Sequence, residues 1–373
     1  MRCAILLPVP VPYREPLFAR LAERGRIDPR VVYLTGEQPG WDQRPDWFAA
    51  RGGYESEVLR SWQRRRSGRA PLMIARGLGA ALRRAAPDVV ASSEYGTGTW
   101  RALAWCRARR RPFVVMSELT PWTDPMLTPL QLRVHRFLAP RLDGFVVFSS
   151  QGRARLERMG VDPARVEVSI QSADLEPFAA GAGERAERPA GRPVRVLTVG
   201  RLVPDKNLPL LIEAFAEAGF AEGEAELELC GGGPLEAELR ALAGRLGAPV
   251  RFRGYATPTE LPAIYADADA LALVSTYEPF GVTVREAAAA GLPLVCTVRA
   301  GAAGDVAVEG ENALLVDPED RGAVVDALRR LVRDEGLRQR LAAGSVAVTA
   351  RHPLEADVEA FERAVLRAAS RAA

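Results

Sequence analysis

Short apolar runs alternate with helical patterns along almost the whole chain. The apolar runs have the length of buried strands, and the helical patterns between them include Pro16–Arg24 and Ile74–Ala85. This alternation predicts parallel sheets with helices on both faces, an α/β fold. The expected strands are Cys3–Leu7, Val31–Leu34, Val89–Ser92, Phe113–Met116, Gly144–Phe148, Val194–Val199, Glu226–Cys230, Val250–Phe252, Ala270–Val274, Leu294–Thr297 and Ala313–Val316.

The alternation occurs twice, on either side of a stretch without apolar periodicity. Residues 177–193 are rich in Ala, Gly, Pro and charge, which is typical of a linker. We therefore expect two Rossmann-like domains, at residues 1–176 and 194–353. A helical pattern over about 354–373 is expected to return to the first domain. Ligands of such sheets bind outside the carboxyl ends of the strands, so a cleft between the domains is the expected site.

Composition excludes several classes of protein. The chain has 373 residues, of which 48% are hydrophobic and 26% charged, as in a globular protein of about two domains. No apolar run approaches the roughly 18 residues of a spanning helix, and the first one is too short for a secretory signal, so we expect a cytoplasmic protein. Four scattered cysteines and two histidines predict core packing rather than a metal site.

The charge balance gives no sign of nucleic-acid binding. The net charge is only +3, and the basic clusters Arg64–Arg66 and Arg107–Arg111 have no stacking aromatic residues interleaved with them. These clusters are most simply solvated helix faces. The functional alternative is a weak peripheral contact with an anionic membrane, at its inner face.

One lysine stands out in an arginine-rich chain. Of the 50 basic residues only Lys206 is a lysine, and a compact ammonium differs physically from a planar guanidinium. Arg201 and Lys206 follow the strand Val194–Val199 and precede a helix in which Leu208 begins the apolar period. Two cations in this loop suit a diphosphate; the alternative is a charged solvent loop.

The segment from Ala270 to Thr297 gives the strongest signal. A strand is followed by Glu278, then Phe280 and Gly281 open a helix that carries Glu286 one turn in. The N–H groups around Gly281 to Thr283 make a natural anion seat. The alternatives are that Glu286 is a solvated helix residue, or that Glu278 and Glu286 are the two carboxylates of a glycosidase. Glycosidases need no diphosphate site, which disfavours the second alternative.

EPFGVTVREAAAAGLPLV resembles the E-x7-E signature of glycosyltransferase family 4, whose GT-B fold has two facing Rossmann-like domains. The order of GRLVPDKN, LCGGGP, VRFRGYATPTELPAIYADAD, the signature and EGENALLVDPED also matches. The resemblance covers about Val194 to Leu331 almost continuously, and the combination is far more specific than any one piece.

The resemblance implies a role for each of these residues. Arg201 and Lys206 would grip the donor diphosphate, Glu278 would bind the donor sugar and Glu286 the ribose. Members of the family retain anomeric configuration and generally need no metal, so the expected co-substrate is a UDP- or GDP-linked sugar without a cofactor. The remaining expected donor contacts are Gly200, Gly232, Gly254, Tyr255, Phe280, Gly281, Val282 and Thr283.

The first half departs from the family pattern. Three prolines (Pro8, Pro10, Pro12) replace the usual Gly-rich loop after the first strand, and Tyr13 and Arg14 follow them. No histidine follows the strand Phe113–Met116, where relatives place one beside the reacting sugar; Glu118 stands there instead. His135 is expected to be a packed or surface residue. The expected acceptor-side residues are Tyr13, Arg14, Glu118, Ser172 and Asp174.

These observations predict a retaining, metal-independent glycosyltransferase that moves a sugar to a hydroxyl acceptor. The acceptor could be a polysaccharide, a lipid-linked intermediate or a small natural product. The alternatives are another GT-B enzyme, such as a nucleotide-sugar epimerase or a phosphorylase, and a catalytically silent nucleotide-binding subunit.

Overall fold

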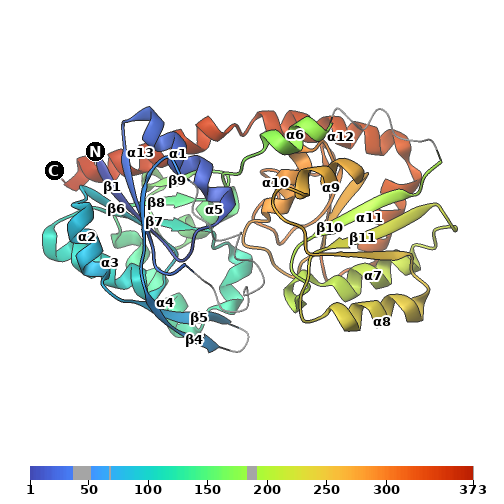
Figure 1. The fold of residues 1–373 in the computed structure, drawn as a ribbon, viewed down its shortest axis with the longest axis horizontal. Coiled ribbons are helices and arrows are strands. Elements are labelled where there is room, and N and C mark those ends of the chain that lie inside the picture. The colour runs from blue at the N-terminus through green and yellow to red at the C-terminus, as the bar shows by residue number, and fades with distance from the viewer. Residues whose placement is uncertain (37–51, 67–68, 183–190, 373) are drawn as a thin grey trace. The chain divides into compact units, whose positions relative to one another are not determined.

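A computed structural model describes residues 1–36, 52–66, 69–182 and 191–372 (Figure 1). The chain divides into two compact units. Unit 1 comprises Met1–Ala173 together with Leu354–Ala373, and unit 2 comprises Asp174–Pro353. The C-terminal helix α13 (Leu354–Ala372) therefore belongs to unit 1, where it packs on strands β8 and β9 and on helix α1.

Unit 1 is built on a seven-stranded parallel sheet in the order β3-β2-β1-β6-β7-β8-β9. The order of the strands along the chain reverses between β1 and β6. A separate antiparallel hairpin is formed by β4 and β5. Besides α13, the elements are β1 Arg2–Leu7, η1 Pro12–Arg14, α1 Glu15–Arg24, β2 Asp28–Tyr33, β3 Glu55–Val58, β4 Ser61–Arg66, β5 Arg69–Ala75, α2 Leu78–Ala85, β6 Val89–Ser93, α3 Thr97–Arg109, β7 Phe113–Ser117, η3 Pro121–Met126, α4 Pro129–Leu138, η4 Ala139–Arg141, β8 Gly144–Val147, α5 Ser150–Arg158, η5 Pro163–Arg165 and β9 Val166–Val168.

Unit 2 has a six-stranded parallel sheet in the order β12-β11-β10-β13-β14-β15, which reverses between β10 and β13. Helices α7 and α8 lie on one side of this sheet and α9 and α10 on the other (Figure 1). The elements are α6 Glu176–Ala182, β10 Val194–Val199, η7 Pro204–Lys206, α7 Leu208–Glu217, β11 Ala225–Cys230, α8 Glu236–Leu246, β12 Val250–Gly254, α9 Leu261–Asp267, β13 Ala270–Leu273, α10 Val282–Ala289, β14 Leu294–Thr297, β15 Ala313–Val316, α11 Arg321–Arg333 and α12 Glu335–Ala350.

Each sheet is buried by apolar side chains on neighbouring helices. In unit 2 the apolar period predicted for α7 fills the core: Leu211, Ile212 and Phe215 are at most 1% exposed. Pro209 lies in the first turn of α7, where its missing N–H costs little. All four cysteines are buried, and burial raises the pKa values of Cys3, Cys106 and Cys296 to about 12.

The eleven strands expected from the apolar runs are present, with ends that differ by a few residues. Two expectations are wrong. The helix expected over Ile74–Ala85 begins only at Leu78, because Ile74 and Ala75 pair with β4 and Gly77 starts the helix at a φ of 77°. The expected linker is helical at its start, where Phe178 of α6 packs its ring edge-on against Tyr265. Residues 183–190 of that linker lie outside the described residues.

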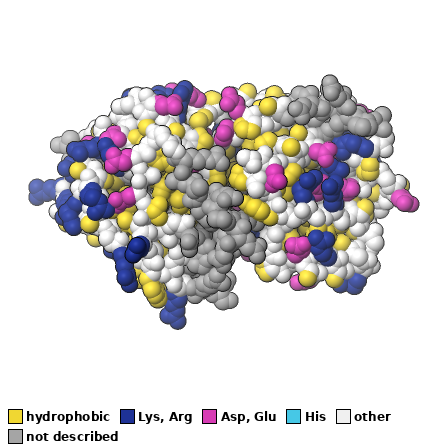
Figure 2. Space-filling model, in the orientation of Figure 1, with side chains coloured by type: hydrophobic (Ala, Val, Ile, Leu, Met, Phe, Trp, Pro, Cys, Tyr) yellow, Lys and Arg dark blue, Asp and Glu magenta, His cyan; other side chains and the backbone are white. Residues whose placement is uncertain are grey.

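The surface mixes both signs of charge. On the face visible in Figure 2, acidic and basic side chains are interspersed, in keeping with the net charge of +3. Within the described residues, none of the helices is both long enough and apolar enough to cross a membrane.

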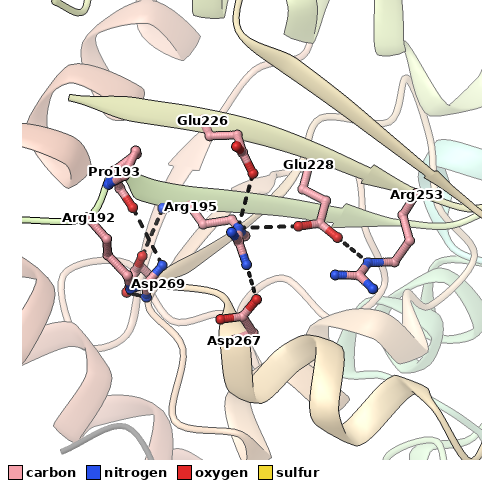
Figure 3. A network of polar contacts seen from close by, with 8 residues as sticks. All are labelled: Arg192, Pro193, Arg195, Glu226, Glu228, Arg253, Asp267 and Asp269. Carbon is pink, nitrogen blue, oxygen red and sulfur yellow. Dashed lines mark hydrogen bonds and ion pairs between the residues drawn. The ribbon is translucent and has the colours of Figure 1, made fainter. Parts of the chain in front are cut away.

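A network of charged side chains crosses the sheet of unit 2 (Figure 3). Glu228 of β11 is fully buried, and its carboxylate pairs with Arg195 of β10 at 3.3 Å and with Arg253 of β12. Arg195 also reaches Glu226, at 3.1 Å, and Asp267. A buried carboxylate is costly unless it is paired, so Arg195 and Arg253 compensate the burial of Glu228.

We expect Arg195→Leu to destabilise unit 2. Loss of one partner of a buried ion pair costs about 3–5 kcal/mol, and because Arg253 still pairs with Glu228 the expected loss is about 2 kcal/mol. The measurement is the free energy of unfolding by urea. Glu236→Gln, which removes an exposed partner of Arg240, is the control and should cost less than about 1 kcal/mol. Equal effects of the two substitutions would contradict this account.

Candidate functional site

The predicted cations and the first predicted carboxylate of unit 2 lie at the point where its strand order reverses. Gly200 and Arg201 directly follow β10, and Glu278 lies in the loop after β13. These two strands are neighbours in the sheet. Ligands of open α/β sheets bind outside the carboxyl ends of the strands at such a reversal. Topology therefore brings together residues that are more than seventy positions apart in the sequence.

Asp205 ties the two loops together. Its backbone carbonyl accepts a hydrogen bond from the N–H of Thr276 at 3.0 Å, and its carboxylate accepts one from the hydroxyl of Tyr277 at 2.7 Å. Burial, together with the Asp205 carboxylate, raises the pKa of Tyr277, so this hydroxyl keeps its proton. The tie fixes the position of Lys206, the next residue, relative to Glu278.

Lys206 forms an ion pair with Glu278. The ammonium group contacts Oε2 of Glu278, and both side chains are largely buried, with exposed fractions of 20% and 14%. Gly200, Arg201 and Lys206 line a small hollow whose floor includes Cys230 and Leu273. The structure thus groups the three residues that the sequence assigned to the diphosphate and the donor sugar.

The glycine run after β11 supports the loop that carries Arg201. A Cβ on Gly231 would lie 1.8 Å from the carbonyl oxygen of Gly200, and one on Gly233 would lie 2.4 Å from that of Leu202. Two hydrogen bonds, Gly200 N–H to Cys230 (2.9 Å) and Leu202 N–H to Gly232 (3.0 Å), join the loops. Gly231 and Gly233 therefore allow backbone packing, and only Gly232 faces open space.

A second glycine contact supports Glu278. A Cβ on Gly301 would lie 2.1 Å from the carbonyl oxygen of Pro279, and the Gly301 N–H donates to the Glu278 carbonyl at 3.0 Å. Gly281 has a φ of +94° and precedes α10, whose first turn, with Val282 and Thr283, carries N–H groups without intrahelical partners. Phe280 is 2% exposed, so its side chain is buried.

Glu286 is held from the side by a tyrosine. The hydroxyl of the fully buried Tyr265 donates to Oε2 of Glu286 at 2.8 Å. Burial raises the pKa of Glu286 to about 7, although this hydrogen bond acts to lower it. A solvated helix residue would show neither feature, so that alternative is wrong. Tyr265 was not singled out in the sequence, because an isolated tyrosine in a helix has no distinctive pattern.

Gly254 and Tyr255 follow the neighbouring strand β12. The carbonyl of Gly254 accepts a hydrogen bond from the N–H of Gly231 at 2.7 Å, which links the end of β12 to the glycine run. The Tyr255 side chain is 39% exposed. An aromatic ring at this edge of the sheet can stack on a planar group.

In unit 1 the strand order reverses between β1 and β6, and four of the five expected acceptor-side residues belong to this unit. Arg14 is 6% exposed, forms an ion pair with Glu118 after β7, and donates to the hydroxyl of Ser93 at 3.3 Å. Ser172 donates to the carbonyl of Tyr13 at 3.5 Å. Asp174, the fifth expected residue, is exposed and belongs to unit 2.

Glu94 is a member of this group that the sequence did not indicate. It follows β6 with a φ of +56°, a conformation that residues other than glycine rarely adopt. Its carboxylate accepts hydrogen bonds from the Ser117 hydroxyl at 3.1 Å and from the N–H of Glu118. Burial, and secondarily the charge of Glu118, raise the pKa of Glu94 to about 7.

His135 does not replace the missing histidine. It is 3% exposed, its ring stacks on Tyr95 at 4.0 Å between centroids, and its Nδ1 lies 3.4 Å from Arg155. Burial, with the neighbouring Arg155, lowers the pKa of His135 to about 4, so the ring is neutral at pH 7. The expected packing role agrees with this environment.

Two family models match the chain, one over each half. Residues 10–169 match the model described as "Glycosyl transferase 4-like domain", and residues 184–345 match "Glycosyl transferases group 1". Together they span most of both units.

Known proteins resemble the chain in sequence and in structure. A D-inositol 3-phosphate glycosyltransferase of Corynebacterium glutamicum is 36% identical over 199 residues, which are 50% of this chain and 47% of that protein. A mannosylfructose-phosphate synthase of Agrobacterium fabrum is 36% identical over 156 residues, 39% of this chain and 34% of that one. The chain thus matches about half or less of the length of these relatives. The structure of HepE from Anabaena in complex with UDP and glucose superimposes with a TM-score of 0.74 at 19% identity, over 97% of this chain and 98% of HepE.

We expect Glu286→Gln to stabilise unit 2 at pH 8 but not at pH 4. The folded carboxyl group has a pKa of about 7 against an unfolded value of 4.5, so its contribution to stability is complete below 4.5 and is lost as the pH rises through 7. Glutamine does not titrate and can still accept from Tyr265. The variant should gain up to about 3 kcal/mol relative to the original chain. Urea unfolding across this pH range measures it.

The control is Glu238→Gln, an exposed carboxylate on α8. Its stability should follow that of the original chain at every pH. A Glu286→Gln variant that behaves in the same way would show that Glu286 does not titrate as its burial requires.

Proposed function

Because the chain belongs to the glycosyltransferases of the family-4 type, with two α/β units of the GT-B kind, we propose that it transfers a sugar from a nucleoside diphosphate to a hydroxyl acceptor with retention of configuration. The observation that carries the proposal is the grouping of Arg201, Lys206 and Glu278 at the strand reversal of unit 2. A hydrolase would have no use for this pair of cations beside a helix N-terminus.

The proposed roles follow from charge. The leaving group of the reaction is a nucleoside diphosphate, whose negative charge grows as the sugar–phosphate bond breaks. Arg201 and Lys206 would neutralise that charge with groups already in position, which is the most effective form of electrostatic stabilisation. No metal ion is part of the proposal, because two side-chain cations supply the charge.

The other residues would orient the donor. Glu278 would accept hydrogen bonds from sugar hydroxyls and Glu286 from the ribose, and Tyr255 would lie against the base. The N–H groups at the start of α10 would receive phosphate or sugar oxygens. A UDP-linked sugar is the first donor to test, because the HepE structure contains UDP; a GDP-linked sugar is the second.

Product analysis separates this proposal from its alternatives. An epimerase converts the donor without an acceptor, a phosphorylase needs phosphate, and a silent subunit binds nucleotide without turnover. Incubation with donor alone, with donor plus an acceptor mixture, and with added phosphate therefore gives four different patterns.

We also propose a cytoplasmic location and a weak contact of the Arg-rich surface with the inner membrane face. Flotation of the protein with anionic vesicles tests this contact.

Lys206→Ala should abolish transfer while the fold remains intact. Removal of one charge-stabilising donor from a preorganised site lowers kcat about 100- to 1000-fold. Lys206→Arg should recover only part of the activity, because a planar guanidinium does not reproduce a compact ammonium in the hollow. The measurement is kcat for sugar transfer, with circular dichroism as the check on folding.

The matched control for this substitution is Arg245→Ala, which removes an exposed cation of α8 in the same unit. Its kcat should equal that of the original protein. Unchanged activity of Lys206→Ala would overturn the phosphate assignment.

Glu278→Gln should separate nucleotide binding from sugar transfer. In the structure Lys206 is already paired with Glu278, so a diphosphate must compete with this carboxylate for the ammonium group. Glutamine removes the competing charge, and UDP should then bind about tenfold more tightly, a gain of about 1.4 kcal/mol. Transfer should fall, because the sugar loses a charged acceptor of its hydroxyl hydrogen bonds.

Titration calorimetry with UDP and with UMP measures this effect. UMP lacks the second phosphate, and its affinity should change less than that of UDP. Weaker binding of UDP to the variant would show that the ion pair does not compete with the nucleotide.

A further inference from the structure

Three charged side chains follow three neighbouring strands of unit 1. Arg14 comes after β1, Glu94 after β6 and Glu118 after β7, at the strand reversal where ligands of such sheets bind. Arg14 holds Glu118 through an ion pair, and Glu94 accepts from the backbone N–H of Glu118. The three side chains therefore form one connected group, which we call the edge triad.

The edge triad leaves hydrogen-bonding capacity unused. Only 6% of the surface of Arg14 is exposed, yet its Nε–H has no partner among the described residues. Glu118 is 23% exposed, and only its Oε1 is engaged by Arg14. Buried donors without a partner are rare in native structures and call for an explanation. On the exposed side, a ligand that donates a hydrogen bond to Oε2 of Glu118 would use the capacity that this partly exposed carboxylate retains.

The charge of the edge triad restricts that ligand. It contains two carboxyl groups and a single guanidinium, and Glu118 already occupies the guanidinium. Arg155, whose charge acts on the neighbouring Tyr95, is bound to Asp124 at 2.6 Å. A phosphate group would meet carboxylates whose cation is already used, whereas a hydroxyl group can donate a charge-assisted hydrogen bond to a carboxylate.

We propose that the edge triad recognises the acceptor, and that this acceptor is an uncharged, hydroxyl-rich molecule rather than a phosphorylated one. The inference rests on the proposed transfer to a hydroxyl group, adds Glu94 to the acceptor side and narrows the class of acceptor. It separates this chain from relatives whose names contain a phosphorylated compound. Glu118 acts in two ways, since its carboxylate attracts hydroxyl groups and repels competing anions.

Ligand-observed NMR on the full chain tests the proposal with matched probes. The samples contain saturating UDP, so that phosphate groups cannot bind in unit 2, and either myo-inositol or myo-inositol 3-phosphate. A second pair is fructose and fructose 6-phosphate. The neutral member of each pair should bind about tenfold more tightly than the phosphorylated one, as expected for one charge-assisted hydrogen bond gained and a repulsion avoided.

Substitutions locate the effect. Glu118→Gln and Glu94→Gln should each weaken binding of the neutral probes about tenfold and leave the affinity for UDP unchanged. Glu118→Gln also removes the ion-pair partner of the Arg14 guanidinium, so the phosphorylated probes should gain affinity for this variant. Glu157→Gln, an exposed carboxylate of α5 in the same unit, is the control and should change neither probe.

The proposal is overturned if the phosphorylated probes bind as well as the neutral ones, if neither binds, or if both glutamine variants keep the original preference. A failure of UDP to bind the original chain is a different result, since it contradicts the proposed function in unit 2 rather than the acceptor class.

Discussion

The hydrogen bonds of Asp205 to the loop after β13 are the constraint on which the proposed donor site depends. They join the loop that carries Arg201 and Lys206 to the loop that carries Glu278. Without this tie, two short loops at the carboxyl edge would each be free to move, and the ion pair of Lys206 with Glu278 would have to order both. The β10–β13 strand reversal brings the loops together, and the hydrogen bonds of Asp205 fix the position of one loop relative to the other.

The glycines beside this tie act on the same loops. Gly231 and Gly233 let the end of β11 approach the Arg201 loop, and Gly301 does the same beneath Glu278. Each position places a carbonyl where a Cβ would stand, so alanine would push the loops apart by more than a hydrogen bond tolerates. The close backbone packing of these glycines therefore limits the movement of the loops that carry Arg201 and Glu278.

The sequence predicts what depends on local pattern. Apolar runs of strand length are local, so the eleven expected strands are confirmed. The E-x7-E segment is also local, and the role of Glu278 stays a prediction. Asp205, Tyr277 and Tyr265 could not be found, because their roles arise from pairing with residues far along the chain. The hairpin and α6 were missed for another reason. SWQRRR is too polar to indicate a strand, and α6 contains only Phe178 as a large apolar anchor. Tertiary contacts, not propensity, decide both elements.

The two units reverse their strand order in the same way, yet they carry different charged groups at the reversal. In unit 2 the cations Arg201 and Lys206 lie with Glu278 and Asp205, whereas in unit 1 the cation Arg14 accompanies two carboxyl groups. On the proposals made above, one edge would accept an anionic nucleotide and the other would accept neutral hydroxyl groups. In both units the backbone brings charged side chains to the strand ends, and the two proposals differ because these charged groups differ. On this proposal, the departure of unit 1 from the family pattern is a change of charged groups at the strand reversal.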